Sequence, residues 1–295
     1  MVMKKTSLKY FQGIALILPA FLFVFFILFL PTVNTVIMSF TNYSFIKGES
    51  TQFIGFSNYL YILKDDEFLS SLGNTFLFAF VTVFFELIVG ILLALIINRS
   101  FALRGVLRTV ILFPWILPTA LNAVVWRWLY NTDFGFFNNL LFSLNIISQK
   151  INWLGAIPLS MISMMLVAIW KTSSFMALII LTGLQTIPES LYEAARIDGA
   201  NPIQCFRKIT LPLLVPSILV ALLFRSMDAF RAFELPFALT QGGPAGSTQT
   251  LSLFGYRQFF QFLKFDTGAT VSVIQFILIF IFGLIYLNIF RVERE

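Results

Sequence analysis

The chain has 295 residues, of which 58% are hydrophobic and 12% are charged, with a formal net charge of +6. Soluble domains carry about 25% charged residues, so this composition indicates a protein whose main solvent is lipid. The sequence has no His and one Cys, which excludes an intrachain disulfide and removes the commonest general base and metal ligand.

Six stretches are apolar for about the 20 residues that a helix needs to cross a bilayer core of roughly 30 Å. They are 13–38, 76–97, 106–129, 157–183, 213–233 and 271–290. The first is too long for a cleaved secretory signal and lacks a clear cleavage site, so we expect a retained anchor. We therefore predict an all-α polytopic membrane protein with six transmembrane helices, built as a tail of residues 1–12 and one six-span domain of residues 13–295.

The cations between the predicted spans indicate the orientation of the chain. With the N-terminus inside, the inner segments hold eleven cations, Lys4, Lys5, Lys9, Arg99, Arg104, Arg108, Arg196, Arg207, Lys208, Arg291 and Arg294. The outer segments hold five, Lys47, Lys64, Lys150, Arg257 and Lys264. Because cytoplasmic loops carry an excess of Lys and Arg, we expect both termini in the cytoplasm.

The second and third spans contain three polar or bending features. Glu86 is either a hydrogen-bonding group that packs helices or an ion site, and we favour packing. Pro114 and Pro118 are expected to bend the third span. The run Trp126-Arg127-Trp128 is typical of an anchor at the outer membrane interface.

A polar segment, "IPESLYEAARIDGANPIQCFRKITLP", lies between the fourth and fifth spans on the predicted cytoplasmic side. It reads as two short helices around a turn. Gly199 is a natural helix stop, and Asn201 can cap a second helix with Gln204 three residues on. We expect Leu211-Pro212 to end that helix before the fifth span. From spacing alone, both a solvated loop and a docking surface for a soluble partner remain open.

The segment resembles the EAA loop of bacterial ABC importer permeases. The matching residues are Glu193-Ala194-Ala195, Asp198-Gly199-Ala200 and Ile209-Thr210-Leu211-Pro212. The loop "LTQGGPAGSTQTL" and the run "IGFSNY" are similar to segments of the maltose-type MalF branch of carbohydrate permeases, with Gln241 replacing one Gly. The resemblance covers nearly the whole chain and implies a permease domain of the type I, maltose-type importer fold.

The resemblance also implies partners. The EAA loop, residues 184–212, would dock on one of two cytoplasmic ATPase subunits. The coupling residues would be Glu193, Ala194, Ala195, Asp198, Gly199, Leu211 and Pro212. A second permease subunit and an extracytoplasmic solute-binding protein are expected, in the bacterial inner membrane. The sequence has no G-x-x-x-x-G-K-[ST] phosphate loop, so ATP hydrolysis is expected on the partner, and no catalytic residue, metal or cofactor is predicted.

Charged residues within the fourth and fifth spans are candidates for a solute site, because an ionisable group in a membrane is costly unless it is paired or hydrated. At 1.5 Å per residue, Lys171 lies roughly 20 Å, Arg225 roughly 18 Å and Asp228 roughly 22 Å from the inner ends of their spans. Arg225, Asp228, Arg231 and Glu234 follow one another at intervals of three, so neighbours can pair. The alternative to a solute site is that these charges neutralise one another along the helix, which would allow it to insert into the membrane or to pack against the second permease.

Alignment on the EAA loop implies solute contacts by resemblance to the maltose-type permease, at Trp170, Lys171, Thr172, Arg225, Ala229 and Ala232. Asp228 and Arg231 join this set because Asp and Arg form strong hydrogen bonds to hydroxyl pairs. The maltose-type permease carries mainly Ser and Asn in this part of the fifth span, which argues against maltose itself. The run Asp228-Ala229-Phe230-Arg231 resembles trehalose-type and other disaccharide permeases.

We therefore predict the permease subunit of an ATP-driven carbohydrate importer, for a di- or oligosaccharide that is trehalose-like. The alternatives are the same architecture importing a compatible solute or phosphorylated polyol, and a stand-alone secondary carrier. A polytopic membrane enzyme would need an acid/base pair or metal ligands facing a cavity, and only the carboxylates of the fifth span are available for that role.

Overall fold

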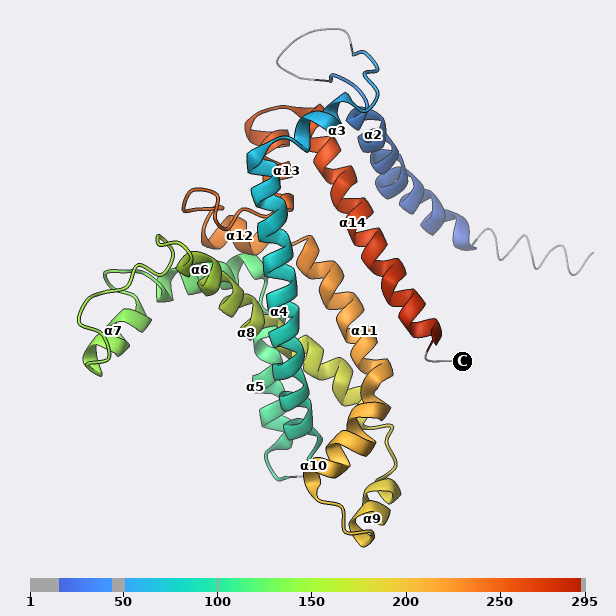
Figure 1. Cartoon of the computed structure of the whole chain (residues 1–295), viewed down its shortest axis with the longest axis vertical. Coiled ribbons are helices and arrows are strands. Elements are labelled where there is room, and N and C mark those ends of the chain that lie inside the picture. The colour runs from blue at the N-terminus through green and yellow to red at the C-terminus, as the bar shows by residue number, and fades with distance from the viewer. Residues whose placement is uncertain (1–15, 44–50, 100, 293–295) are drawn as a thin grey trace, which may run out of the picture. The chain divides into compact units, whose positions relative to one another are not determined.

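A computed structural model describes residues 16–43, 51–99 and 101–292 (Figure 1). The predicted tail of residues 1–12 lies outside these residues. The chain divides into two compact units, the first formed by Met1–Lys64 with Gly255–Ile274 and the second by Asp65–Phe254 with Gln275–Glu295. In the described part of the chain the regular structure is helical, and the pairing of Thr41 with Phe53 is an isolated bridge.

The first unit contains an apolar helix, Leu16–Ser39, which is long enough to cross a membrane. Its C-terminal end is fixed by polar contacts, since the Ser39 carbonyl accepts hydrogen bonds from Asn58 Nδ2 at 3.0 Å and from Thr270 Oγ1 at 3.3 Å. The helices of this unit are η1 (Phe25–Phe29), α2 (Leu30–Ser39), α3 (Ser57–Ile62), η3 (Arg257–Gln261) and the first part of α14 (Phe265–Val292).

The second unit holds both regions that the sequence singles out. Its elements are α4 (Asp66–Asn98), α5 (Arg104–Ile116), α6 (Thr119–Leu129), α7 (Phe136–Ser143), α8 (Leu159–Leu184), α9 (Glu189–Ile197), α10 (Pro202–Cys205), η2 (Phe206–Thr210), α11 (Leu211–Phe230), α12 (Glu234–Leu239), most of α13 (Leu251–Tyr256) and the C-terminal part of α14.

The predicted spans are present as five long apolar helices and one bent pair. The third span, expected over 106–129, is not one continuous helix, because α5 and α6 meet at 95°. Leu117 between them is extended, with ψ at 132°. A residue before proline is driven out of the helical region, so Pro118 accounts for the break. The expected bend is therefore confirmed, but it is much sharper than a kink within a helix.

The fifth span differs from the expectation at both ends. Helical structure runs without interruption from Pro202 to Phe230, so Leu211-Pro212 does not end the second helix of the EAA loop. The π-helical turn η2 precedes Pro212, and the Leu211 N–H bonds the Phe206 carbonyl five residues back. We infer that this wider turn accommodates a proline, which has no N–H to donate and crowds the preceding turn. At the other end α11 stops at Phe230.

The core of the second unit is built on α4, which packs against α8 and α11. Two glycines permit the close approach of these helices. A Cβ at Gly90 would lie 2.6 Å from Met176 Cβ, and a Cβ at Gly183 would lie 2.7 Å from Ser217 Cβ. Small residues at helix crossings are typical of membrane proteins, where packing drives association.

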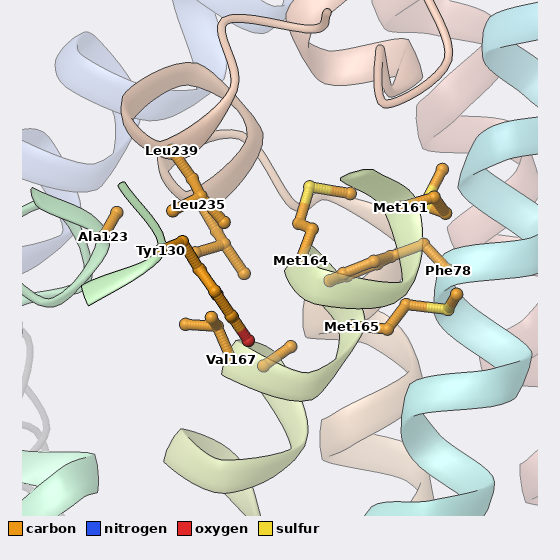
Figure 2. Packing of buried hydrophobic residues seen from close by; sticks show 10 residues of the cluster. Phe78, Ala123, Tyr130, Met161, Met164, Met165, Val167, Leu235 and Leu239 are labelled. Atoms are coloured by element: carbon orange, nitrogen blue, oxygen red, sulfur yellow. The ribbon is translucent and has the colours of Figure 1, made fainter. Parts of the chain in front are cut away.

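A second part of the core joins α6 and α12 to α8 and α4. Figure 2 shows this cluster, in which Tyr130 at the end of α6 lies beside Leu235 and Leu239 of α12. Met161, Met164 and other side chains of α8 complete it. Methionine fills irregular gaps well, which suits a junction between short helices that meet at steep angles. The cluster fixes α12 and the N-terminal half of α8, the helix that carries Trp170 and Lys171.

Candidate functional site

Glu86, Thr172 and Arg225 meet in the interior of the second unit, from α4, α8 and α11 respectively. Arg225 Nε donates to Glu86 Oε2 at 2.8 Å, and Arg225 Nη2 donates to Glu86 Oε1 at 3.1 Å. The exposed fractions of the Arg225 and Glu86 side chains are 9% and 0%. A bidentate pair is the strong form of this interaction, and it compensates part of the cost of burying both charges.

Asp228 extends this pair towards the surface of the unit. Its Oδ2 lies 3.5 Å from Arg225 Nη1, and its Oδ1 accepts a hydrogen bond from Arg231 Nη2. The side chains of Asp228 and Arg231 are 43% and 67% exposed. Two of the three neighbouring pairs that the sequence allows are therefore present, Arg225 with Asp228 and Asp228 with Arg231. We call Glu86, Lys171, Thr172, Arg225, Asp228 and Arg231 the charged cluster.

The side chain of Lys171, a residue of α8, reaches the C-terminal end of α5, where the chain bends sharply into α6. Its Nζ donates to the Trp115 carbonyl at 3.4 Å, and its side chain is buried. The last carbonyls of a helix have no partner within the helix and favour a cation, so this position suits an ammonium group. Within the described ranges no carboxylate oxygen lies within 4.0 Å of Lys171 Nζ, which leaves hydrogen-bonding capacity for another group.

The remaining predicted solute contacts differ in exposure. Trp170 is 42% exposed and packs edge-on against Trp126, with ring centroids 5.3 Å apart. Trp126 thus packs inside the unit, while Trp128 is 55% exposed, and the interfacial anchor at 126–128 stays a prediction. Ala229 is enclosed in a buried apolar cluster, and Ala232 packs beside the cluster of Figure 2. In this conformation Trp170, Asp228 and Arg231 offer the accessible surface.

Two features of the cluster differ from the sequence reading. Glu234 does not continue the series on α11, because that helix ends at Phe230 and Glu234 begins α12. Glu86 bonds side chains of two other helices, as its favoured packing role predicts, but it was not assigned to the candidate site although it is the main partner of Arg225. The available signal was that two charges of opposite sign, Glu86 and Arg225, lie at similar depths in the second and fifth predicted spans.

The EAA loop forms the predicted pair of short helices at one end of the second unit (Figure 1). Gly199 ends α9 with φ at +79°, a conformation that favours glycine. Asn201 caps α10, accepting from the Gln204 N–H at 2.9 Å while the Gln204 side chain accepts from the Asn201 N–H at 2.8 Å. The Tyr192 and Thr210 hydroxyls lie 2.9 Å apart and join α9 to η2.

The surface of the EAA loop combines charge with exposed apolar side chains. Glu193, Ala194, Asp198 and Gly199 are exposed, whereas Ala195 and Leu211 are half-buried. Pro212 is also exposed. Ile197 and Ile203 are 86% and 69% exposed, which is unusual for isoleucine at a polar surface. Neither isoleucine was predicted to be a contact, although both are apolar residues in an otherwise polar segment.

Residues 86–292 match the model of a protein family described as "Binding-protein-dependent transport system inner membrane component". The chain is similar to the trehalose/maltose transport system permease protein MalF of Thermococcus litoralis, with 38% identity over 98% of each chain. It is also similar to the sulfoquinovosyl glycerol transport system permease protein SmoG of Agrobacterium fabrum, with 39% identity over 95% of this chain and 91% of that protein.

A solved structure has the same fold. It is a chain of a bacterial ABC transporter involved in the import of the acidic polysaccharide alginate, with a TM-score of 0.85 and 22% sequence identity. The alignment covers 99% of both chains. At this level of identity the likeness concerns the arrangement of the helices alone.

Proposed function

Because the chain belongs to the family of inner membrane components of binding-protein-dependent transport systems, we propose that it is the permease subunit of an ATP-driven carbohydrate importer. The observation that best supports this proposal is the continuous helix from Pro202 to Phe230. Its first turns belong to the exposed EAA loop, and Arg225 lies roughly 35 Å further along at 1.5 Å per residue. A rigid helix of this length can carry a displacement of the loop to the charged cluster.

The solute in this proposal is a di- or oligosaccharide, and trehalose is the first candidate. The relative in Thermococcus litoralis is named for trehalose and maltose. The exposed members of the cluster suit a polyol, since Asp228 and Arg231 form charge-assisted hydrogen bonds with hydroxyl groups. Trp170 offers an exposed ring on which one face of a sugar can stack. Lys171, Thr172, Arg225, Ala229 and Ala232 remain predicted contacts of this site.

The proposed assembly follows from the EAA loop. One of two cytoplasmic ATPase subunits docks on α9 and α10, with Ile197 and Ile203 as apolar anchors and Glu193 as a charged contact at their edge. Exposed apolar side chains of this kind mark protein interfaces. A second permease subunit completes the pathway, and an extracytoplasmic binding protein delivers the solute. ATP is hydrolysed on the ATPase, so this chain performs no covalent chemistry, and both of its termini are cytoplasmic.

A second candidate solute is an anionic glycoside. The relative in Agrobacterium fabrum is named for sulfoquinovosyl glycerol, and its identity to this chain is as high as that of the trehalose/maltose permease. Arg231, which is 67% exposed, suits a sulfonate or phosphate group. The pairing of Arg231 with Asp228 favours an uncharged polyol, because an anion has to displace the carboxylate.

The first experiment is a mild-detergent purification of the tagged chain from its own host, followed by native mass spectrometry. We expect one different permease subunit and two copies of an ATPase to accompany it. A chain recovered alone or as a homodimer under several gentle conditions would contradict the importer and favour a stand-alone carrier.

Glu193→Lys tests the docking site in the same experiment. Reversal of this exposed charge on α9 is expected to lower the amount of ATPase in the purified complex at least tenfold, while the second permease remains bound. Asp133→Lys is the matched control, because Asp133 is also exposed but lies in the predicted outer loop. Equal loss of the ATPase from both variants would rule out a specific role of α9.

A further inference from the structure

Glu86 is a carboxylate with no exposed surface in the middle of a helix long and apolar enough to span a membrane. It lies twelve residues before the end of α4 at Asn98, which is roughly 18 Å along the helix. An ionisable group at such a position is costly and needs a partner. Neither the family resemblance nor the proposed solute site assigns any role to it.

The carboxylate of Glu86 joins three helices. Its Oε2 accepts from Arg225 Nε, and its Oε1 accepts from Arg225 Nη2 and lies within hydrogen-bonding distance of the Thr172 hydroxyl. The same hydroxyl also lies 2.6 Å from the Ala168 carbonyl, within its own helix. A hydroxyl has one proton, so Thr172 donates it either to Glu86 or to Ala168. In both cases the proton points to a protein oxygen.

Arg225 is held in one orientation by these contacts. With Nε and Nη2 bound to Glu86, the third nitrogen, Nη1, is left to face Asp228 Oδ2 at 3.5 Å. The planar guanidinium cannot turn without breaking both bonds to Glu86. Burial of the side chains falls steadily along this series, with exposed fractions of 0% for Glu86, 9% for Arg225, 43% for Asp228 and 67% for Arg231. The charges thus lead from the interior to the accessible surface.

We propose that Glu86 is a positioning residue of the solute site. It does not touch the solute, and it acts by fixing Arg225, which orients the carboxylate of Asp228 towards the pathway. The Thr172 hydroxyl, which contacts Glu86 Oε1, belongs to the same support. The inference rests on the proposed function in one respect, namely that Asp228 and Arg231 meet the solute.

The test uses Glu86→Gln in the complete importer. The amide keeps the shape and one acceptor but removes the charge that orders Arg225. A hydrogen bond to a charged group contributes more than a neutral one, so we expect the apparent KM for uptake of labelled trehalose or maltose to rise about five- to tenfold. The yield of the assembled complex should not change. Glu67→Gln is the matched control, since Glu67 is on the same helix and bonds Gln249 Nε2 at 2.9 Å, outside the charged cluster.

A second measurement needs no knowledge of the sugar. Glu86 and Asp228 are not bonded to each other and communicate only through Arg225, so Glu86→Gln and Asp228→Asn should have non-additive effects on the melting temperature of the purified complex. The cycle of Glu67→Gln with Asp228→Asn should be additive.

The two readouts separate the inference from the proposed function. If the wild-type complex transports neither sugar, the choice of solute is wrong, and the melting cycle still decides whether Glu86 acts on Asp228. If Glu86→Gln reduces the yield of the complex while the KM is unchanged, Glu86 only packs helices and the inference is overturned. Additive melting temperatures for Glu86 and Asp228 would overturn it as well.

Discussion

Arg225 directs its three nitrogens towards the carboxylates of Glu86 and Asp228. These contacts differ from the direct solute contact that its position in the sequence suggests. A lone arginine in a membrane helix is a natural candidate for direct solute contact. In the structure its side chain is 9% exposed and engaged with Glu86 and Asp228. The exposed side chains are those of Asp228 and Arg231, which follow Arg225 in the series. Charge at a similar depth therefore predicted which residues cluster, but not which of their side chains are exposed.

Asp228→Ala is the most direct test of the site at the scale of one residue. Removal of the carboxylate takes away the partner of Arg231 and an acceptor for solute hydroxyls, so we expect uptake to fall at least tenfold. The complex should still assemble, because Arg225 keeps its bidentate pair with Glu86. Initial uptake rates, normalised to the amount of complex, measure the effect, with Asp133→Ala as the control. Normal uptake by Asp228→Ala would remove Asp228 from the solute site.

The pairing of Asp228 with Arg231 was predictable, because residues three apart in a helix are neighbours. The pairing of Glu86 with Arg225 was not, since the two residues are 139 positions apart. No local sequence pattern predicts which helices pack together, or how each helix is rotated about its own axis. The sequence placed both charges near the same depth, and only the packing of α4 against α11 brings them into contact.

Among the helices, the EAA loop was the most predictable element. Its signals are local, since Gly199 supplies the left-handed turn and Asn201 with Gln204 forms the capping box. The ends of the long helices were less predictable. Pro212 is a helix breaker in isolation, yet the π-turn before it lets the helix continue. A choice between α and π geometry depends on packing around the turn, which a linear pattern does not contain.

The crossing of α4 with α8 gives a prediction at this scale. Gly90→Ala places a Cβ 2.6 Å from Met176 Cβ, so the two helices have to separate. Overpacking of this kind typically costs about 1–3 kcal/mol, and we expect a lower melting temperature and less assembled complex.

Gly73→Ala is the control for this substitution in the same helix. A Cβ at Gly73 meets no atom within 4 Å. The change should leave stability unaltered or raise it by up to about 1 kcal/mol, because alanine favours a helix more than glycine does. If both variants melt like the wild type, the close contact of α4 with α8 does not limit stability.

Across the whole molecule, the sequence predicted a polytopic helical protein and its family, and both are confirmed. Long apolar runs are strong signals because, in lipid, each run must form its backbone hydrogen bonds within its own helix. The position of the break between α5 and α6 was predicted from the prolines, but the angle between the two helices was not. Its angle of 95° depends on the short helices and the aromatic and methionine side chains that hold α6 beside α8 and α12.

The orientation of the chain stays a prediction, and the single thiol can test it. Cys205 is partly exposed and belongs to the EAA loop. We expect a membrane-impermeant maleimide to label it in inside-out vesicles and not in intact cells with a permeable outer layer. Asp133→Cys in a Cys205→Ser background should show the reverse pattern. Labelling of Cys205 from outside would invert the predicted topology.

The fall in burial along Glu86, Arg225, Asp228 and Arg231 has an electrostatic consequence. Mobile ions and water screen the outermost pair, Asp228 with Arg231, far more than the innermost pair, Glu86 with Arg225. The innermost pair is therefore the strongest of the series, because it is both bidentate and buried. We expect an arriving polar molecule to exchange with the exposed Arg231, while the pair of Glu86 with Arg225 keeps its geometry.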